Sequence, residues 1–275
     1  MQNTKYTQAG NDAAYYEHVK EKNNWIDDGP YKSIVEFINN QFKVGQADNV
    51  LEIGCGMAEI IDYIPNSIKY TGLDPSEFMI NKLRSEHPDQ SLYVGFSEEL
   101  PIKDNTQDIV FSCQVLEHVF SPPRAMSEMI RVAKPSGLIL VTSPNLECPW
   151  SMPNSVRHYS KLQKFNLMIK RFGDLFLRNF GILKFRMIPE NYVQFSGKYE
   201  KSDDDLTHIT SAYEVAQYFK KQNCKLIYCR KLASDVKSFK NSLKDVVRLI
   251  PVLKYYHSGL YFIFQKSGNI NSDIS

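Results

Sequence analysis

The chain has 275 residues, of which 43% are hydrophobic and 23% charged, and its formal net charge at pH 7 is +2. A chain of this length and composition can bury a sizeable core without disulfides or a structural metal, which excludes a fibrous or wholly disordered protein. The charge balance is too even for a protein whose main partner is bulk nucleic acid.

The cysteine pattern and the absence of targeting segments indicate a cellular compartment. The five cysteines have no repeated spacing and no CxxC pair, which excludes a zinc ribbon and disfavours a secreted disulfide framework. The N-terminus lacks the apolar stretch of a signal peptide, and no run of 18 apolar residues predicts a membrane-spanning helix. We therefore expect a protein of the reducing cytoplasm.

The first half of the chain alternates between strand and helix patterns. A polar, tyrosine-rich arm of about 25 residues precedes a helix that begins at Pro30. Ser76 and Pro122 are placed to start two further helices. Short apolar segments predict five strands, at 50–53, 69–73, 92–94, 108–112 and 138–142. Strands that alternate with helices indicate a parallel sheet with helices on both faces.

The alternation stops after Asn145, and residues 146–207 predict no further strand–helix unit. A helix capped by Ser211 and a basic helix at about 237–250 follow, with strands at 225–229 and 260–264. We expect the last strand to pair in an antiparallel manner. The prediction is one domain over 1–275, divided into an arm and helix (1–45), a core (46–145), an insert (146–207) and a C-terminal part (208–275).

Glycines and a carboxylate follow the first two predicted strands at their carboxyl ends, where open α/β sheets bind ligands. Gly54 and Gly56 allow a ligand to approach the backbone closely. Asp74 ends the next strand, where a carboxylate can accept hydrogen bonds from both ribose hydroxyls of a nucleoside. The combination indicates a cofactor that contains adenosine.

The residue types around this turn favour a cofactor without phosphates. The third small residue of a dinucleotide fingerprint would fall at position 59, where this chain has Glu59. A glutamate there would repel a pyrophosphate, which disfavours a nicotinamide oxidoreductase. Glu52 adds negative charge beside the turn. These features suit a cationic, phosphate-free nucleoside such as S-adenosylmethionine.

Residues 49–145 resemble the class I S-adenosylmethionine-dependent methyltransferases. The resemblance is carried by VLEIGCGMAE, YTGLDPS and EELPIKDNTQDIVFSCQVLEHVFSPPRAMSEMIRVAKPSGLILVTSPN, in the family's order. It implies an α/β fold with a Rossmann-like, doubly wound, seven-stranded sheet, mostly parallel with an antiparallel last strand, and here a helical insert after strand five. It also implies an S-adenosylmethionine-dependent methyltransferase.

The same resemblance implies a set of cofactor contacts. Glu52, Gly54, Cys55 and Gly56 would hold the methionine portion and Asp74 the ribose. Phe96 and Ser97 would flank the adenine, and Cys113 and Gln114 would line the side of the methyl group. Two positions depart from the family pattern. Ala58 stands where a third glycine is common, and Phe96 replaces an acidic adenine contact, so that Phe96 would stack on adenine or Ser97 and Glu98 would replace that contact.

A methyl transfer needs a base only where the nucleophile must lose a proton. The candidates for that role are Glu117, His118 and His208. Structural roles, at a helix start for His118 and near a helix cap for His208, are the alternatives. A divalent metal on these three residues is a further alternative, by similarity to metal-dependent methyltransferases with a Glu-x-x-Glu-His pattern. Because Gln114 replaces the first glutamate of that pattern, we expect no metal.

The insert is unusually basic. Residues 155–187 contain eight lysines and arginines against Asp174, which gives +7, and six aromatic residues lie among them. This segment could grip an anionic acceptor such as a nucleotide-linked or phosphorylated sugar, or rest on an anionic membrane surface. The alternative is a helical lid with its apolar stripe on the core and its charges in water. No nucleic-acid partner is expected, and the oligomeric state stays open.

The expected function is O-methylation of a small metabolite or saccharide, for example a nucleotide-linked or cell-surface glycan precursor. One alternative is a lipid- or quinone-pathway methyltransferase that works at the membrane surface. Another is a non-catalytic scaffold subunit that binds an adenosine cofactor.

Overall fold

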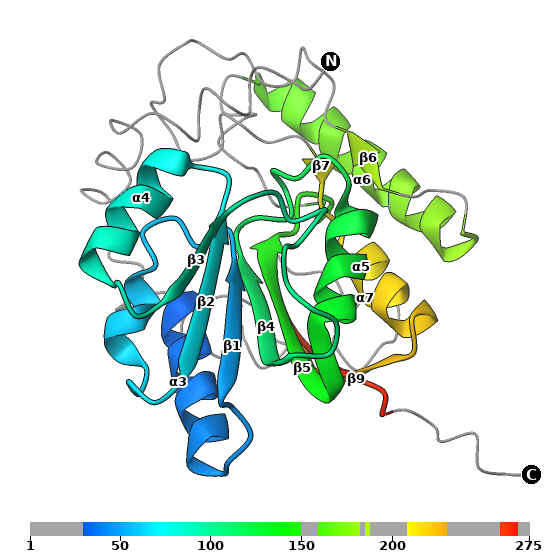
Figure 1. Ribbon diagram of the computed structural model, residues 1–275. Coiled ribbons are helices and arrows are strands. Elements are labelled where there is room, and N and C mark those ends of the chain that lie inside the picture. Colours follow the sequence, from blue (N-terminus) through cyan, green and yellow to red (C-terminus); the bar gives the residue numbers. More distant parts are fainter. Residues whose placement is uncertain (1–29, 150–158, 182–184, 188–207, 230–258, 269–275) are drawn as a thin grey trace, which may run out of the picture.

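The computed structural model describes residues 30–149, 159–181, 185–187, 208–229 and 259–268. Seven strands of this part form one sheet: β1 (Asn49–Ile53), β2 (Lys69–Asp74), β3 (Ser91–Val94), β4 (Gln107–Cys113), β5 (Ala133–Pro144), β8 (Cys224–Cys229) and β9 (Gly259–Lys266). Their order across the sheet is β3-β2-β1-β4-β5-β9-β8. Figure 1 shows this sheet at the centre of the molecule.

The strand directions confirm the predicted topology. The pairs β1–β2, β2–β3, β1–β4 and β4–β5 are parallel. The last strand, β9, is antiparallel to both of its neighbours, β5 and β8. The chain therefore has the expected mostly parallel seven-stranded sheet with an antiparallel last strand, and the carboxyl ends of β1 to β5 share one edge.

Helices cover both faces of the sheet (Figure 1). One face is covered by α3 (Pro30–Lys43), the short 3-10 helix η1 (Glu59–Tyr63) and α4 (Glu77–Glu86), and the other by α5 (Pro122–Val132) and α7 (Ala212–Lys221). The predicted caps are present: the hydroxyl of Ser76 accepts from the backbone N–H of Met79, and that of Ser211 accepts from Glu214. Separate hydrophobic clusters fill the two faces.

Ile60, Ile61 and Ile64, after β1, have the spacing of a helix face, but this segment does not form an α-helix. It forms only the 3-10 helix η1, which ends before Pro65. Proline has no backbone N–H to donate, and it disfavours a helical conformation of the residue before it, which limits the helix at this point. Two other expectations, the arm over the first 25 residues and the basic helix at 237–250, lie outside the described residues.

The described part of the insert contains the long helix α6 (Lys161–Asn179) and the strand β6 (Arg186–Met187), which forms a two-stranded sheet with β7 (His208–Ile209). Ser160 and Gln163 form a capping box at the start of α6. In Figure 1, α6 lies beyond the carboxyl edge of the sheet, on the side of α5 and α7. The helix therefore borders the edge where a ligand was predicted.

Buried charges help to attach α6 to the rest of the fold. Arg178 is fully buried and pairs with Glu147, from the segment after β5, and with Glu214 of α7. Arg186 of β6 joins the network through Glu147, at 3.1 Å between Nη2 and Oε1, and through Asp174 of α6, at 2.6 Å between Nη1 and Oδ2. We call these five residues the α6 ion network.

The α6 ion network corrects the expectation about the basic insert. Arg171, which is also buried, donates to the carbonyl oxygen of Cys148 at 3.0 Å, and Arg178 is held by two carboxylates. These two arginines are therefore engaged inside the protein, not placed to grip an anionic acceptor. The alternative interpretation, a lid with its apolar stripe on the core and its charges in water, also fails at Arg171 and Arg178, because both charged side chains are buried.

Removing the central cation should destabilise the fold strongly. In Arg178→Ala, the Glu214 carboxylate would remain buried without its cation and Glu147 would keep only Arg186, and breaking a buried pair costs about 3–5 kcal/mol in comparable cases. Urea unfolding, followed by circular dichroism, measures the change in the free energy of unfolding. The control is Lys170→Ala on an exposed face of the same helix, which should change it by about 0.5 kcal/mol or less. Equal effects of the two substitutions would contradict a stabilising role of the network.

Candidate functional site

The turn after β1 is built around Gly54, which has a φ of +70°. A Cβ added at this position would lie 2.3 Å from Cγ2 of Val115, which follows β4. The backbone N–H groups of Gly54 and Cys55 both donate to the carbonyl oxygen of Leu73, at 2.7 and 3.0 Å. Only glycine meets both the conformational and the steric requirement, so the turn lies tightly against the ends of β2 and β4.

Asp74 lies directly beside this turn, at the end of β2. Its Oδ2 accepts from the backbone N–H of Gly56 at 2.9 Å, and its Oδ1 accepts from that of Ser76 at 2.9 Å. A carboxylate has about four lone-pair positions, so it can accept from ribose hydroxyls as well as from these two amides. The two amides fix the orientation of Asp74, the predicted ribose contact, before any ligand binds.

Ala58, at the position where the family pattern often has glycine, adopts φ 50° and ψ 36°. A non-glycine residue in this left-handed region costs on the order of 1 kcal/mol. The methyl group of Ala58 is buried, so it also packs against the core. The departure from glycine therefore has a conformational cost as well as the packing consequence that the sequence indicates.

Two aromatic rings stand together near the ends of β3 and β4. Phe96 and Phe120 are 36% and 37% exposed, and their ring centroids are 6.2 Å apart. Phe120 was not recognised from the sequence. Their exposed faces offer an apolar surface of the kind on which an adenine ring can stack.

Glu98, the expected replacement for the missing acidic adenine contact, is bound within the protein. Its Oε1 accepts from the backbone N–H groups of Phe120 and Ser121, at 2.7 and 3.0 Å, and its Oε2 accepts from the hydroxyl of Ser97 at 2.9 Å. The side chains of Ser97 and Glu98 thus hold the segment after β4. The structure favours aromatic stacking by Phe96 over a polar contact from these two residues.

Glu52 does not lie where its expected role as a ligand contact requires. Its carboxyl group is fully buried and accepts from the hydroxyls of Tyr31, on α3, and Tyr70, on β2, at 2.8 and 2.6 Å. Burial raises the pKa of Glu52 to about 8, although both hydrogen bonds lower it. Burial therefore favours the neutral form of this carboxyl group. It joins α3 to the sheet and supplies no open negative charge to a cofactor.

The two cysteines of the predicted site have buried side chains. The Cys55 sulfur lies 3.0 Å from where a Cβ on Gly72 of β2 would stand, and the Cys113 sulfur accepts from the hydroxyl of Thr142 at 3.2 Å. Burial raises the pKa of both thiols well above the ordinary range. Gln114, with φ +57°, is half-buried and donates its backbone N–H to the carbonyl oxygen of Thr142. At Cys55 and Cys113, only the backbone is suited to contact a ligand.

The proposed acid–base residues lie in the segment after β4. The Glu117 carboxylate is buried and accepts from the hydroxyl of Ser143, at the end of β5, at 2.8 Å. Nε2 of His118 lies 3.9 Å from Oε1 of Glu117, and the His118 side chain is 16% exposed. Of this pair, His118 is the residue that reaches the surface, and the buried Glu117 lies behind it.

His208 joins this segment across a long stretch of sequence. Its backbone N–H donates to the carbonyl oxygen of Glu117 at 3.0 Å, and its ring is hydrogen-bonded to the backbone of Val119. Burial lowers the pKa of His208, which favours a neutral ring at pH 7. Within the described ranges, no group of three or more His, Cys, Asp or Glu side chains is arranged to hold a metal ion. His208 therefore lies against the segment that carries Glu117 and His118.

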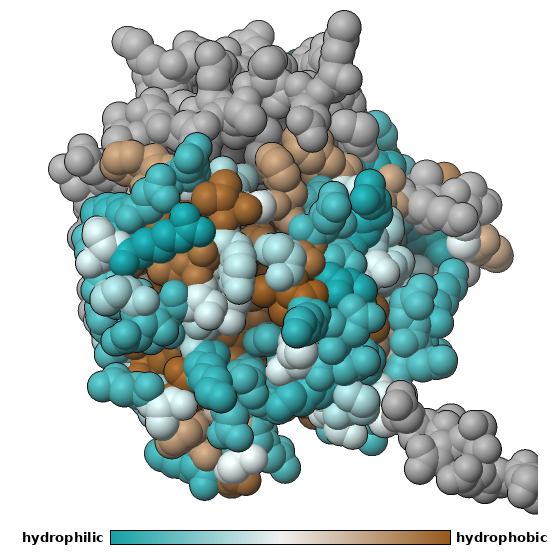
Figure 2. Space-filling view, viewed as in Figure 1, coloured by the Kyte–Doolittle hydropathy of each residue, from teal (hydrophilic) through white to brown (hydrophobic). Residues whose placement is uncertain are grey.

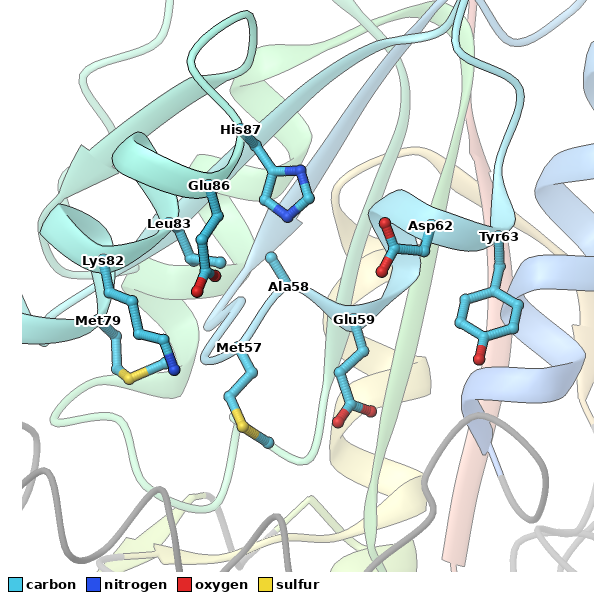
Figure 3. Close-up of a pocket in the computed structure, with 10 residues that line it drawn as sticks. All are labelled: Met57, Ala58, Glu59, Asp62, Tyr63, Met79, Lys82, Leu83, Glu86 and His87. Carbon is cyan, nitrogen blue, oxygen red and sulfur yellow. The ribbon is translucent and has the colours of Figure 1, made fainter.

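A hollow of about 280 Å³ lies between η1 and α4 (Figure 3). Most of the polar residues that line it are charged, among them Glu59, Asp62, Lys82 and Glu86. Figure 3 shows that they come from both helices and that Met57 and Ala58 lie at the side of the glycine turn. None of the predicted cofactor contacts lines this hollow. It adjoins the candidate site but is separate from it.

Several contacts of the site were not recognised from the sequence. Val115 packs against the glycine turn at Gly54, the Tyr31 hydroxyl donates to Glu52, and the Ser143 hydroxyl donates to Glu117. The nearest signal for Ser143 is its place at the end of a predicted strand, where ligand-binding residues gather. The sequence carries no comparable signal for Tyr31, because its partner is 21 residues away in another element.

Comparison with known proteins agrees with this geometry. Residues 51–141 match a family model described as a methyltransferase domain. A probable S-adenosylmethionine-dependent methyltransferase of Mycolicibacterium smegmatis is 36% identical over 98 residues, which cover 35% of this chain and 38% of that protein. An uncharacterized methyltransferase of Schizosaccharomyces pombe is 32% identical over 135 residues, which cover 44% of this chain and 48% of that protein. The matches span less than half the length of these two relatives.

Solved structures extend the likeness of fold beyond that segment. An S-adenosylmethionine-dependent methyltransferase from Mesorhizobium loti superposes with a TM-score of 0.51 at 11% identity. The match covers 86% of this chain and 97% of that chain. The similarity in fold thus includes elements on both sides of residues 51–141.

Substituting Gly54 should disturb the turn in a way that depends on Val115. Gly54→Ala adds a Cβ that overlaps Cγ2 of Val115 and forces a left-handed alanine, for a combined cost of about 2–4 kcal/mol. The double variant Gly54→Ala/Val115→Ala removes the overlap but keeps the backbone strain. A double-mutant cycle of urea unfolding should therefore give a favourable coupling energy. Purely additive effects would show that the two residues are not in close contact.

Glu52 should make the stability of the protein depend on pH. The pKa of Glu52 is about 8 in the folded chain against an ordinary value of 4.5, so the folded chain binds this proton more tightly. The free energy of unfolding then falls as pH rises through this interval, by up to about 1.4 kcal/mol per pH unit from this group. Glu52→Gln should reduce that fall between pH 5 and pH 8.5, whatever its effect on absolute stability.

The matched control for the pH measurement is Glu36→Gln, which removes an exposed carboxylate from the outer side of α3. Urea unfolding at pH 5 and pH 8.5 gives the change in the free energy of unfolding between these pH values for the wild type and for each of the two variants. The control should keep the pH dependence of the wild type. A Glu52→Gln variant that does the same would contradict the raised pKa of Glu52.

Proposed function

We propose that this protein, whose residues 51–141 match a methyltransferase domain, transfers a methyl group from S-adenosylmethionine to a hydroxyl of a small metabolite or saccharide. The observation that carries the proposal is that the glycine turn and Asp74 are hydrogen-bonded to each other at the carboxyl edge of the sheet. There Oδ2 of Asp74 accepts from the backbone N–H of Gly56 at 2.9 Å. Open α/β sheets bind their ligands at this edge.

The residues present fit S-adenosylmethionine. The turn at Gly54 is packed against Val115, its Gly56 N–H is bonded to the Asp74 carboxylate at the carboxyl edge of the sheet, and Phe96 and Phe120 form an apolar surface. These residues would hold the methionine portion, the ribose and the adenine, in that order. When bound, the cofactor supplies a methyl group already activated by its positively charged sulfur. Most of the protein's contribution is therefore to hold the acceptor close and in line.

A hydroxyl acceptor must lose a proton when it is methylated, and His118 is the residue that we assign to accept it. Its side chain reaches the surface beside the segment after β4, and the buried Glu117 lies 3.9 Å away, where a negative charge would stabilise a protonated imidazole. Ser143 donates to Glu117 and orients it. His208, bound through its backbone to Glu117, supports the same segment.

A lipid- or quinone-like acceptor at a membrane surface is the second candidate. One observation favours it: α6, beside the same edge of the sheet, exposes large apolar side chains. The burial of Arg171 and Arg178 removes two of the cations that would bind a phosphorylated or nucleotide-linked acceptor. A non-catalytic scaffold stays the alternative of another class, and turnover of S-adenosylmethionine with a labelled methyl group distinguishes it from both enzymes.

Removing the carboxylate of Asp74 should weaken cofactor binding. In Asp74→Ala, the charge-assisted hydrogen bonds to the ribose are lost, which weakens binding of S-adenosylmethionine by about 1.5–3 kcal/mol. Isothermal titration calorimetry of the full chain measures the dissociation constant, and circular dichroism confirms that the variant is folded. Nicotinamide adenine dinucleotide should not bind to the wild type.

The matched control is Asp62→Ala, which removes an exposed carboxylate from the hollow between η1 and α4. This variant should bind S-adenosylmethionine as tightly as the wild type. A weaker complex for Asp62→Ala together with an unchanged one for Asp74→Ala would place the cofactor in the hollow and overturn the assignment.

A further inference from the structure

The outward face of α6 carries a continuous line of large apolar side chains. They recur at intervals of three and four residues, which places them on one side of the helix. Each is between 43% and 68% exposed. We call them the α6 stripe: Leu162, Phe165, Ile169, Phe172, Phe176 and Phe180. A surface helix of a globular protein normally turns such a stripe toward the core.

The buried face of α6 explains why the stripe points outward. Arg171 and Arg178 lie on the opposite side of the helix, bound to the carbonyl oxygen of Cys148 and to the carboxylates of the α6 ion network. Rotating the stripe toward the core would remove Arg178 from two buried carboxylates, at a high cost in free energy. The ion network therefore fixes the exposure of the stripe.

The exposed charges of α6 are positive. Lys161 and Lys170 are exposed and Lys164 is half-buried, and all three are on the helix that carries the stripe. The sole acid of the α6 sequence, Asp174, is paired with Arg186 at 2.6 Å. An apolar face on a helix with lysines and no exposed carboxylate has the composition of helices that lie in the surface of an anionic membrane.

We propose that the α6 stripe docks this protein on an anionic lipid surface. The stripe extends over the 19 residues from Leu162 to Phe180, the C-cap of α6, or about 27 Å at 1.5 Å per residue step, along one side of the helix. Such a helix can lie in the plane of the interface, with its aromatic rings among the acyl chains and its lysines at the lipid phosphates. No helix in the described part of the chain is long and apolar enough to cross a membrane.

A second copy of this chain fits the α6 stripe less well. Two α6 helices packed face to face would bring together surfaces whose exposed charges are all lysines, with no exposed carboxylate on the helix to pair with them. Repulsion between like charges opposes that contact, whereas lipid phosphates complement the same lysines. The charge pattern thus favours an anionic lipid surface.

The position of α6 gives the docked protein a defined orientation. Figure 1 places α6 at the carboxyl edge of the sheet, the edge that holds the glycine turn and Asp74. In Figure 2, viewed from the same side, pale brown atoms lie at the right-hand edge, near the place of the end of α6 in Figure 1. Docking through the stripe would bring this edge close to the lipid surface. The docking itself does not depend on the proposed methyl transfer.

Vesicle sedimentation of the full chain tests the proposal. The probes are vesicles of phosphatidylcholine alone and vesicles of about 3 parts phosphatidylglycerol to 7 parts phosphatidylcholine, whose anionic headgroups attract lysines and arginines. We expect binding to the anionic vesicles that weakens with added salt. The double variant Phe165→Glu/Phe176→Glu should reduce the partition coefficient at least about tenfold, because it places charges in the apolar face.

The matched control is Val44→Glu/Tyr63→Glu, which makes the same charge change at two exposed apolar residues on the α3 and η1 side of the molecule. It should bind vesicles like the wild type. A second pair compares Lys161→Gln/Lys164→Gln/Lys170→Gln, which should weaken binding to anionic vesicles, with Lys32→Gln/Lys43→Gln/Lys69→Gln, which should not. Circular dichroism confirms folding of each variant.

Three results would overturn the proposal. The first is the absence of vesicle binding by the wild type. The second is a lack of selectivity: the wild type binds both vesicle types equally, or the stripe variant and its control bind anionic vesicles equally. The third is a dimer in analytical ultracentrifugation that the stripe variant dissociates while vesicles do not bind, which would identify a second copy as the occupant. Methyl transfer to a soluble acceptor, measured separately, distinguishes a failure of docking from a failure of the proposed function.

Discussion

The close approach of the glycine turn to the ends of β2 and β4 is the constraint on which the candidate site depends. Because Gly54 has no Cβ, its backbone can lie against Val115 and donate to the carbonyl oxygen of Leu73. This packing brings the N–H of Gly56 to the carboxylate of Asp74. A loose turn at this point would separate the residues expected to hold the two ends of an adenosine cofactor, even if every side chain were kept.

A second constraint acts on the side where an acceptor would enter. The α6 ion network joins residues from α6, α7, β6 and the segment after β5, so it ties the helix to three other parts of the fold. Buried ion pairs contribute less to net stability than their number suggests, but they fix the orientation of the elements they join. In this protein they hold the arginines inward and the aromatic rings outward, which leaves an apolar surface beside the candidate site.

The sequence predicted the sheet, the caps at Ser76 and Ser211 and the turn at Gly54, because each depends on local hydrophobic spacing or on one residue's conformational preference. It did not predict the environment of Glu52, since the motif places this residue beside a ligand while its hydrogen-bond partner Tyr31 is 21 residues away. The orientation of α6 was equally inaccessible. Amphipathic spacing identifies two faces of a helix, and the partner of Arg178 that decides which face is buried, Glu147, is 31 residues away.

The most direct test of the central claim, that the turn at Gly54 and Asp74 forms the cofactor site, is amide hydrogen exchange of the full chain with and without saturating S-adenosylmethionine. The account predicts slower exchange in segments 54–57, 74–76 and 95–98, and unchanged exchange in segment 82–87 of the neighbouring hollow. Protection confined to 59–63 and 82–87, or no protection at 54–57, would contradict it.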